Sequence, residues 1–127
     1  MESEKKRYEI GPLDAGPIAP IDVEPSETER QLGRLEAAPP EADALARQDY
    51  RSVIQVLAKE HPSLDQANNL GYAYAWLGYQ QNDYSLWAKA LSVLQTAEQQ
   101  AEPPEQHDRV ARNLDRVRAA LNAWAAE

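Results

Sequence analysis

The residues best suited to chemistry in this chain are three aromatic side chains in one predicted helix, and the chemistry is non-covalent recognition. Tyr72, Trp76 and Tyr79 recur at i, i+4 and i+7, which places them on one side of a helix. Tyrosine and tryptophan offer large contact areas with few rotatable bonds, so they dominate protein-binding hot spots. Two interpretations stay open. This aromatic stripe either binds a partner, or lies buried under the helix predicted over 41–60 or under the N-terminal segment.

Two adjacent side-chain amides, Asn68 and Asn69, favour the binding interpretation. Each amide both donates and accepts hydrogen bonds, so the pair can hold the backbone of an extended peptide. Catalysis has no comparable support. His61 and His107 lie far apart in the sequence at predicted helix boundaries, where capping or solvent exposure explains them. With no serine–base motif and no phosphate-binding glycine loop, we predict a protein that is not an enzyme and has no cofactor and no metal.

A basic patch on the last predicted helix is a further candidate site. Arg109, Arg112 and Arg116 share one side of this helix, and Asp108 and Asp115 interrupt the patch. The simplest interpretation is a solvated face with local ion pairs. The functional interpretation is a site for an acidic segment, which the N-terminal region of the same chain could supply. Its candidate carboxylates are Asp14, Asp22, Glu24, Glu27 and Glu29.

Composition narrows the class of partner. The net charge of −8 repels nucleic-acid phosphates and anionic lipid headgroups, so we expect neither nucleic acid nor membrane as a partner. The absence of cysteine excludes disulfides and thiolate chemistry. The N-terminus lacks the apolar core of a signal peptide, and no apolar run reaches membrane-spanning length. We therefore expect a cytoplasmic protein, while prior removal of a signal peptide stays open.

The elements that must position these residues are predicted to be helices. Six of the nine prolines and three of the five glycines lie in residues 1–40, which predicts an extended, largely disordered tail with a short helix near 28–37. In the remainder, prolines and capping signals such as Ser63 separate helix-sized blocks. The block 41–60 allows a bend near Gln48. The sequence thus predicts an all-α domain over 41–127, an antiparallel array of helices over about 41–60, 64–79, 84–100 and 105–125.

The helix predicted over 64–79 resembles the first helix of a tetratricopeptide (TPR) repeat. The resemblance lies in a leucine–glycine pair for close helix packing, a tyrosine one turn later and a glycine that closes the helix. These residues are Leu70, Gly71, Tyr74 and Gly78. The resemblance implies a TPR-like antiparallel hairpin array with one to two repeats and a final capping helix. The chain departs from the pattern at Ala67, where a large residue is usual, and in a longer turn after Gly78.

The same resemblance implies where a partner binds, because the first helix of each TPR repeat lines a concave face that grips peptides. The corresponding positions here are Asp65, Asn68, Tyr72, Ala75 and Trp76. We therefore expect an interaction module, such as an adaptor, scaffold or assembly factor, that binds a peptide or partner helix on the face of helix 64–79. The tail would occupy this face or reach a second partner. The alternative is a structural subunit that homo-oligomerises through the aromatic stripe.

Overall fold

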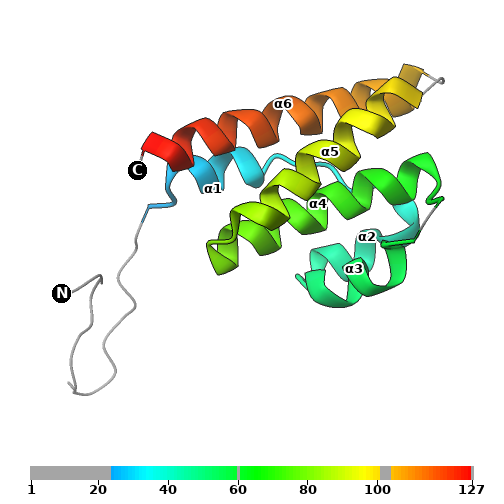
Figure 1. The fold of residues 1–127 in the computed structure, drawn as a ribbon, viewed down its shortest axis with the longest axis horizontal. Coiled ribbons are helices and arrows are strands. Elements are labelled where there is room, and N and C mark those ends of the chain that lie inside the picture. Colours follow the sequence, from blue (N-terminus) through cyan, green and yellow to red (C-terminus); the bar gives the residue numbers. More distant parts are fainter. Residues whose placement is uncertain (1–23, 60, 101–103, 127) are drawn as a thin grey trace.

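The computed structural model describes residues 24–59, 61–100 and 104–126, and the regular structure in these residues is entirely helical (Figure 1). This confirms the predicted all-α class for the described part of the chain. The prediction of a disordered tail falls largely on residues 1–23, which lie outside the described residues. The elements are α1 (Glu27–Leu32), the 3-10 turn η1 (Pro39–Glu41), α2 (Ala42–Ala46), α3 (Tyr50–Leu57), α4 (Leu64–Gln81), α5 (Tyr84–Gln100) and α6 (Pro104–Ala126).

Capping residues set the ends of α4, the central helix. Ser63 Oγ accepts a hydrogen bond from the backbone N–H of Gln66 at 3.1 Å, and Gln66 Oε1 accepts one from the N–H of Ser63 at 3.0 Å. This reciprocal pair is the capping box that the sequence predicts. At the other end Asn82 adopts a left-handed backbone with φ 55°, which asparagine tolerates and which stops the helix. Asn82 therefore ends α4, two residues beyond the predicted end, and Gly78 lies inside the helix.

The helix predicted over 41–60 is two short helices, α2 and α3. Gln48 lies between them with φ 63°, a left-handed conformation that cannot continue a right-handed helix. The short helix predicted near 28–37 also ends early, at Leu32. Gly33 caps it, and residues 35–38 that follow have no helical structure. This stretch leaves α1 and crosses towards η1.

Close packing of α4 on α5 depends on two glycines. A Cβ atom on Gly71 would lie 2.5 Å from Cγ of Leu94, far inside van der Waals contact. A Cβ atom on Gly78 would lie 3.1 Å from the backbone oxygen of Asp83 and 3.2 Å from Cβ of Leu86. Both glycines allow the two helix axes to approach closely, which is the role that the TPR resemblance assigns to Gly71.

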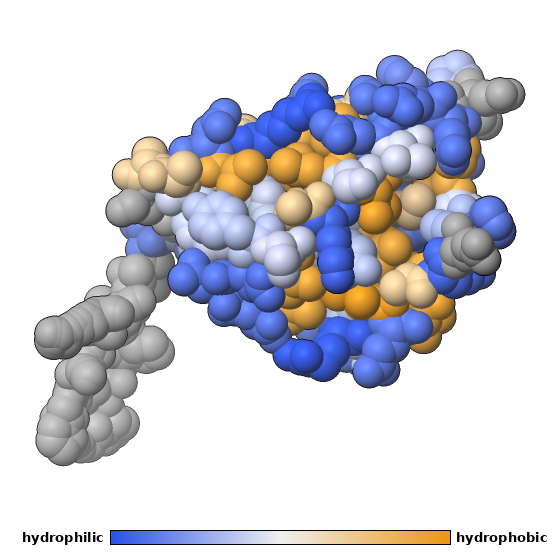
Figure 2. All heavy atoms as spheres, viewed as in Figure 1, coloured by the Kyte–Doolittle hydropathy of each residue, from blue (hydrophilic) through white to orange (hydrophobic). Residues whose placement is uncertain are grey.

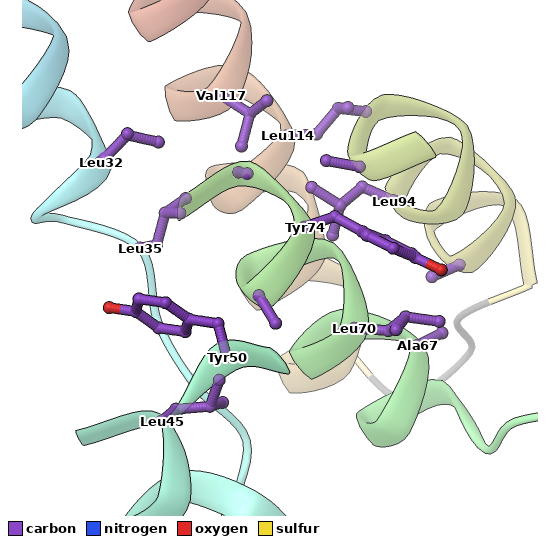
Figure 3. Close-up of a cluster of buried hydrophobic side chains, with 14 of the residues drawn as sticks. Leu32, Leu35, Leu45, Tyr50, Ala67, Leu70, Tyr74, Leu94, Leu114 and Val117 are labelled. Carbon is purple, nitrogen blue, oxygen red and sulfur yellow. The ribbon is translucent and has the colours of Figure 1, made fainter. Parts of the chain in front are cut away.

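The hydrophobic core surrounds α4, with side chains from α5 and α6 on one side and from α3 and the N-terminal region on the other (Figure 3). Leu32, Leu35 and Ala38 are buried in this core. Residues 26–38, which the sequence assigned to a tail, therefore belong to the folded unit. This was hard to predict from the sequence, because the apolar residues near Leu32 are too few to show a helical period.

One face of the molecule carries both apolar and hydrophilic residues at its surface (Figure 2). On the face seen in Figure 2, apolar residues gather across the middle, and hydrophilic residues line the outer edges. α1 runs beside α6 on this side of the molecule (Figure 1). None of the helices in the described ranges is long and apolar enough to cross a membrane.

Candidate functional site

Side-chain amides on α4 and α6 hold a non-helical stretch of the chain, residues 34–38, which we call the strap. Oδ1 of Asn69 accepts a hydrogen bond from the N–H of Ala38 at 2.6 Å, and Nδ2 of Asn69 donates to the carbonyl of Ala38 at 3.1 Å. Asn113 on α6 makes the equivalent pair of hydrogen bonds with Glu36. Its Oδ1 accepts from the N–H of Glu36 and its Nδ2 donates to the carbonyl of Glu36, both at 2.7 Å. Each amide thus satisfies both backbone groups of one residue, as a neighbouring β-strand would.

Asn68 joins the two amides into one network, which we call the amide clamp (Asn68, Asn69 and Asn113). Its Nδ2 donates to the carbonyl of Glu36 at 2.9 Å, and its Oδ1 accepts from Nδ2 of Asn113 at 2.8 Å. All three asparagines have no exposed surface. Burying an amide is costly unless it is hydrogen-bonded, so the strap supplies partners that the clamp needs.

The basic patch on α6 binds the one acidic side chain of the strap. Nε and Nη2 of Arg112 form two hydrogen bonds with the carboxylate of Glu36, at 2.8 and 2.9 Å. Nη1 of Arg116 lies 3.4 Å from the same carboxylate and also donates to the backbone oxygen of Arg34. The hydrogen bond from Arg112 lowers the pKa of Glu36, and the same contact raises the pKa of Arg112. Because this pair is partly exposed, water screens the attraction, and the pair mainly fixes the position of the strap.

Among the described residues, the carboxylates that contact the basic patch are those of Glu36 and Asp65, and neither is among the five expected from the sequence. Glu24 and Glu27 instead contact Arg30, each at 3.3 Å, and Glu29 completes the N-terminal capping box of α1. Glu36 contacts Arg112 and Arg116 because it lies in the strap, next to α6. Two further candidates, Asp14 and Asp22, lie outside the described residues.

Part of the aromatic stripe is covered by α3. The ring of Tyr50 stacks on Trp76, with centroids 6.2 Å apart and planes 3° apart, and lies 6.2 Å from the ring of Tyr72. Burial, assisted by Tyr72, raises the pKa of Tyr50 to about 12, and burial raises the pKa of Tyr72 as well. Trp76 and Tyr72 nevertheless keep partial exposure. The chain itself therefore covers this part of the aromatic stripe only in part.

Tyr79, at the end of the stripe, has a different environment. Its hydroxyl lies 3.1 Å from Oγ of Ser26, the residue that caps α1, and its ring meets Trp124 of α6 edge-on at 5.7 Å. Tyr79 thus ties the N-terminal region to α4 and α6.

The six residues predicted to bind a partner therefore have unequal access to solvent. Asn68 and Ala75 have no exposed surface, and the three aromatic residues are partly buried. Asp65 pairs with Arg109 at 3.3 Å and links α4 to α6. Sequence reasoning missed Asn113, although a signal was present: an asparagine precedes a leucine in both helices, as Asn69-Leu70 and Asn113-Leu114.

Chemistry of other kinds has little support among the described residues. His61 and His107 are exposed, and this part of the chain contains no group of three or more acidic or histidine side chains that could hold a metal ion. A hollow of about 490 Å³ opens beside Ala67 and Leu70. Comparison of the chain with protein-family models, with curated proteins and with solved structures finds no match.

Proposed function

We propose that this protein is a non-enzymatic interaction module that binds an extended segment of a partner protein across α4 and α6. The observation that carries the proposal is the amide clamp, which holds Glu36 and Ala38 through their backbone groups. Backbone N–H and C=O groups occur in every peptide, so a face that binds them can accept a segment from another chain. Such a module serves as an adaptor, scaffold or assembly factor, and a cytoplasmic location stays a prediction from the sequence.

A TPR-like arrangement is part of the proposal. The glycine-dependent contact between α4 and α5 supports it, as does the order of the elements, with α3 before this hairpin and α6 after it. In the TPR family the first helices of successive repeats line the peptide-binding face. Here α4 and α6 would take that position, with α6 as the capping helix, and the strap lies across this pair.

Tyr72 and Trp76 extend the proposed face along α4. With Asn69 they stand at i, i+3 and i+7, so all three share one side of the helix. Both aromatic side chains keep partial exposure, so a bound segment could pack against their rings. Homo-oligomerisation through the aromatic stripe is the alternative, and it has less support because Tyr50, Ser26 and Trp124 of the same chain already cover parts of the stripe.

Selection of a random-peptide display library on the full chain tests the proposal. We expect enriched peptides to shift the side-chain amide NMR signals of Asn68, Asn69 and Asn113. A Val56→Ser chain is a suitable control, because Val56 is 65% exposed on α3 and belongs to no part of the clamp. Failure to enrich any peptide, or shifts confined to other surfaces, would count against the proposal. Light scattering over a range of protein concentrations separates the peptide-binding module from a homo-oligomer.

A further inference from the structure

The strap makes side-chain contacts as well as backbone contacts, and these contacts describe a ligand. We propose that the α4/α6 face selects an internal acidic segment of the pattern Leu-Glu-x-Ala, and that Leu35-Glu36-Ala37-Ala38 is a resident copy which such a segment displaces. The inference rests on the proposed function, since it names the partner of the same face.

Each position of the pattern follows from the environment of one strap residue. Leu35 is buried to 7% exposure in the core, so its position requires an apolar side chain. Glu36 meets the fork of Arg112, whose two parallel donors match a carboxylate. Ala37 is only partly buried and leaves its position open. Ala38 is fully buried beside Asn69, where a longer side chain would have no space.

The amide clamp suits a segment inside a polypeptide chain better than a chain terminus. Asn69 and Asn113 each use one N–H and one carbonyl of the strap, and the polypeptide continues from both sides, into α1 and into η1. A terminal carboxylate would replace a backbone carbonyl with a charged group and offer no N–H beyond it. The expected ligand is therefore a segment within a partner protein.

Several features allow the strap to leave. α1 has six residues, too few to form a stable helix by itself, so it depends on the contacts that it makes with α6. Gly33 on one side of the strap and Pro39 on the other are exposed, and the ion pair between Glu36 and Arg112 is partly exposed. A ligand that binds only the open state has its apparent affinity reduced by the fraction of open molecules. Weakening the strap without altering α4 or α6 should therefore strengthen binding.

Charge reversal on either side of the ion pair gives a direct test with the full chain. The probe is a fluorescently labelled peptide of residues 33–40, Gly-Arg-Leu-Glu-Ala-Ala-Pro-Pro, measured by fluorescence anisotropy. We expect a Glu36→Lys chain to bind this probe about fivefold more tightly than the unaltered chain, because its own strap no longer satisfies Arg112. A probe with lysine at the position of Glu36 should instead prefer an Arg112→Glu chain. A Glu105→Lys chain, changed at an exposed residue in the first turn of α6, should bind like the unaltered chain.

The outcomes separate this inference from the proposed function. Equal binding of both probes by the Glu36→Lys chain would overturn the inference. So would library-selected peptides that bind the amide clamp but lack an acidic residue two positions before a small one, although the proposed function would then stand. Absence of any peptide binding would overturn both. If Glu36→Lys prevents folding, Glu36→Gln keeps the shape of the side chain and should still increase affinity for the original probe.

Discussion

Replacement of Asn69 by alanine is the sharpest perturbation of the amide clamp. The change removes both hydrogen bonds between Asn69 and Ala38, at 2.6 and 3.1 Å. The N–H and carbonyl groups of Ala38 are then buried without partners. Each unsatisfied buried group costs about 1–3 kcal/mol, so the free energy of unfolding should fall by about 2–4 kcal/mol once some water enters the space. This is a large share of the roughly 5–15 kcal/mol that stabilises a typical domain.

Urea denaturation of Asn69→Ala measures this loss, and trypsin digestion shows where it acts. Arg34 lies in the strap, so release of the strap should speed cleavage after Arg34 before the rest of the domain unfolds. Asn122→Ala is the matched control, because Asn122 is exposed on α6 and its replacement should change stability by no more than about 0.5 kcal/mol. If Asn69→Ala were as stable as the control, with Arg34 equally protected, the clamp would not hold the strap.

Three other changes test separate parts of the structure. Glu36 has a lowered pKa in the folded protein, so its ion pair stabilises the protein above the ordinary pKa of 4.5, and this contribution disappears as pH falls below that value. Glu36→Gln should therefore weaken the loss of thermal stability as pH falls below about 4.5. The pKa of Tyr50 is raised to about 12, so its contribution is complete below pH 10 and decreases as pH rises further, and Tyr50→Phe should weaken this alkaline loss. Gly71→Ala should lower the free energy of unfolding, measured in urea, by about 1–3 kcal/mol, because the new Cβ would clash with Leu94. When Leu94→Ala is already present in the chain, Gly71→Ala should cost less.

The long helices were predictable because their signals are local. Apolar periodicity and the capping box at Ser63 depend on residues three to four apart, and they placed α4, α5 and α6 with small errors at the ends. The break between α2 and α3 depends on a left-handed Gln48, and glutamine carries no strong preference for this conformation. For this reason the sequence allowed a bend there but did not predict two helices.

The candidate site was predictable only in part, because its decisive contacts join distant residues. Asn68 and Asn69 were expected to hold an extended backbone, since adjacent amides suit that role. Their bonds to Glu36 and Ala38 span more than thirty positions, and those from Asn113 to Glu36 span 77. No periodicity or local motif encodes such pairs. Whether Tyr72 and Trp76 bind a partner stays a prediction.

Hydrogen exchange of two backbone amides tests most directly whether a partner segment takes the place of the strap. The N–H groups of Glu36 and Ala38 are bound to Asn113 and Asn69, so they should exchange slowly in the free protein. On saturation with a peptide that carries the Leu-Glu-x-Ala pattern, both N–H groups should lose protection while amides in α4 and α5 keep theirs. Unchanged protection of Glu36 and Ala38 in the saturated complex would contradict the claim that α4 and α6 form a peptide-binding face occupied by the strap.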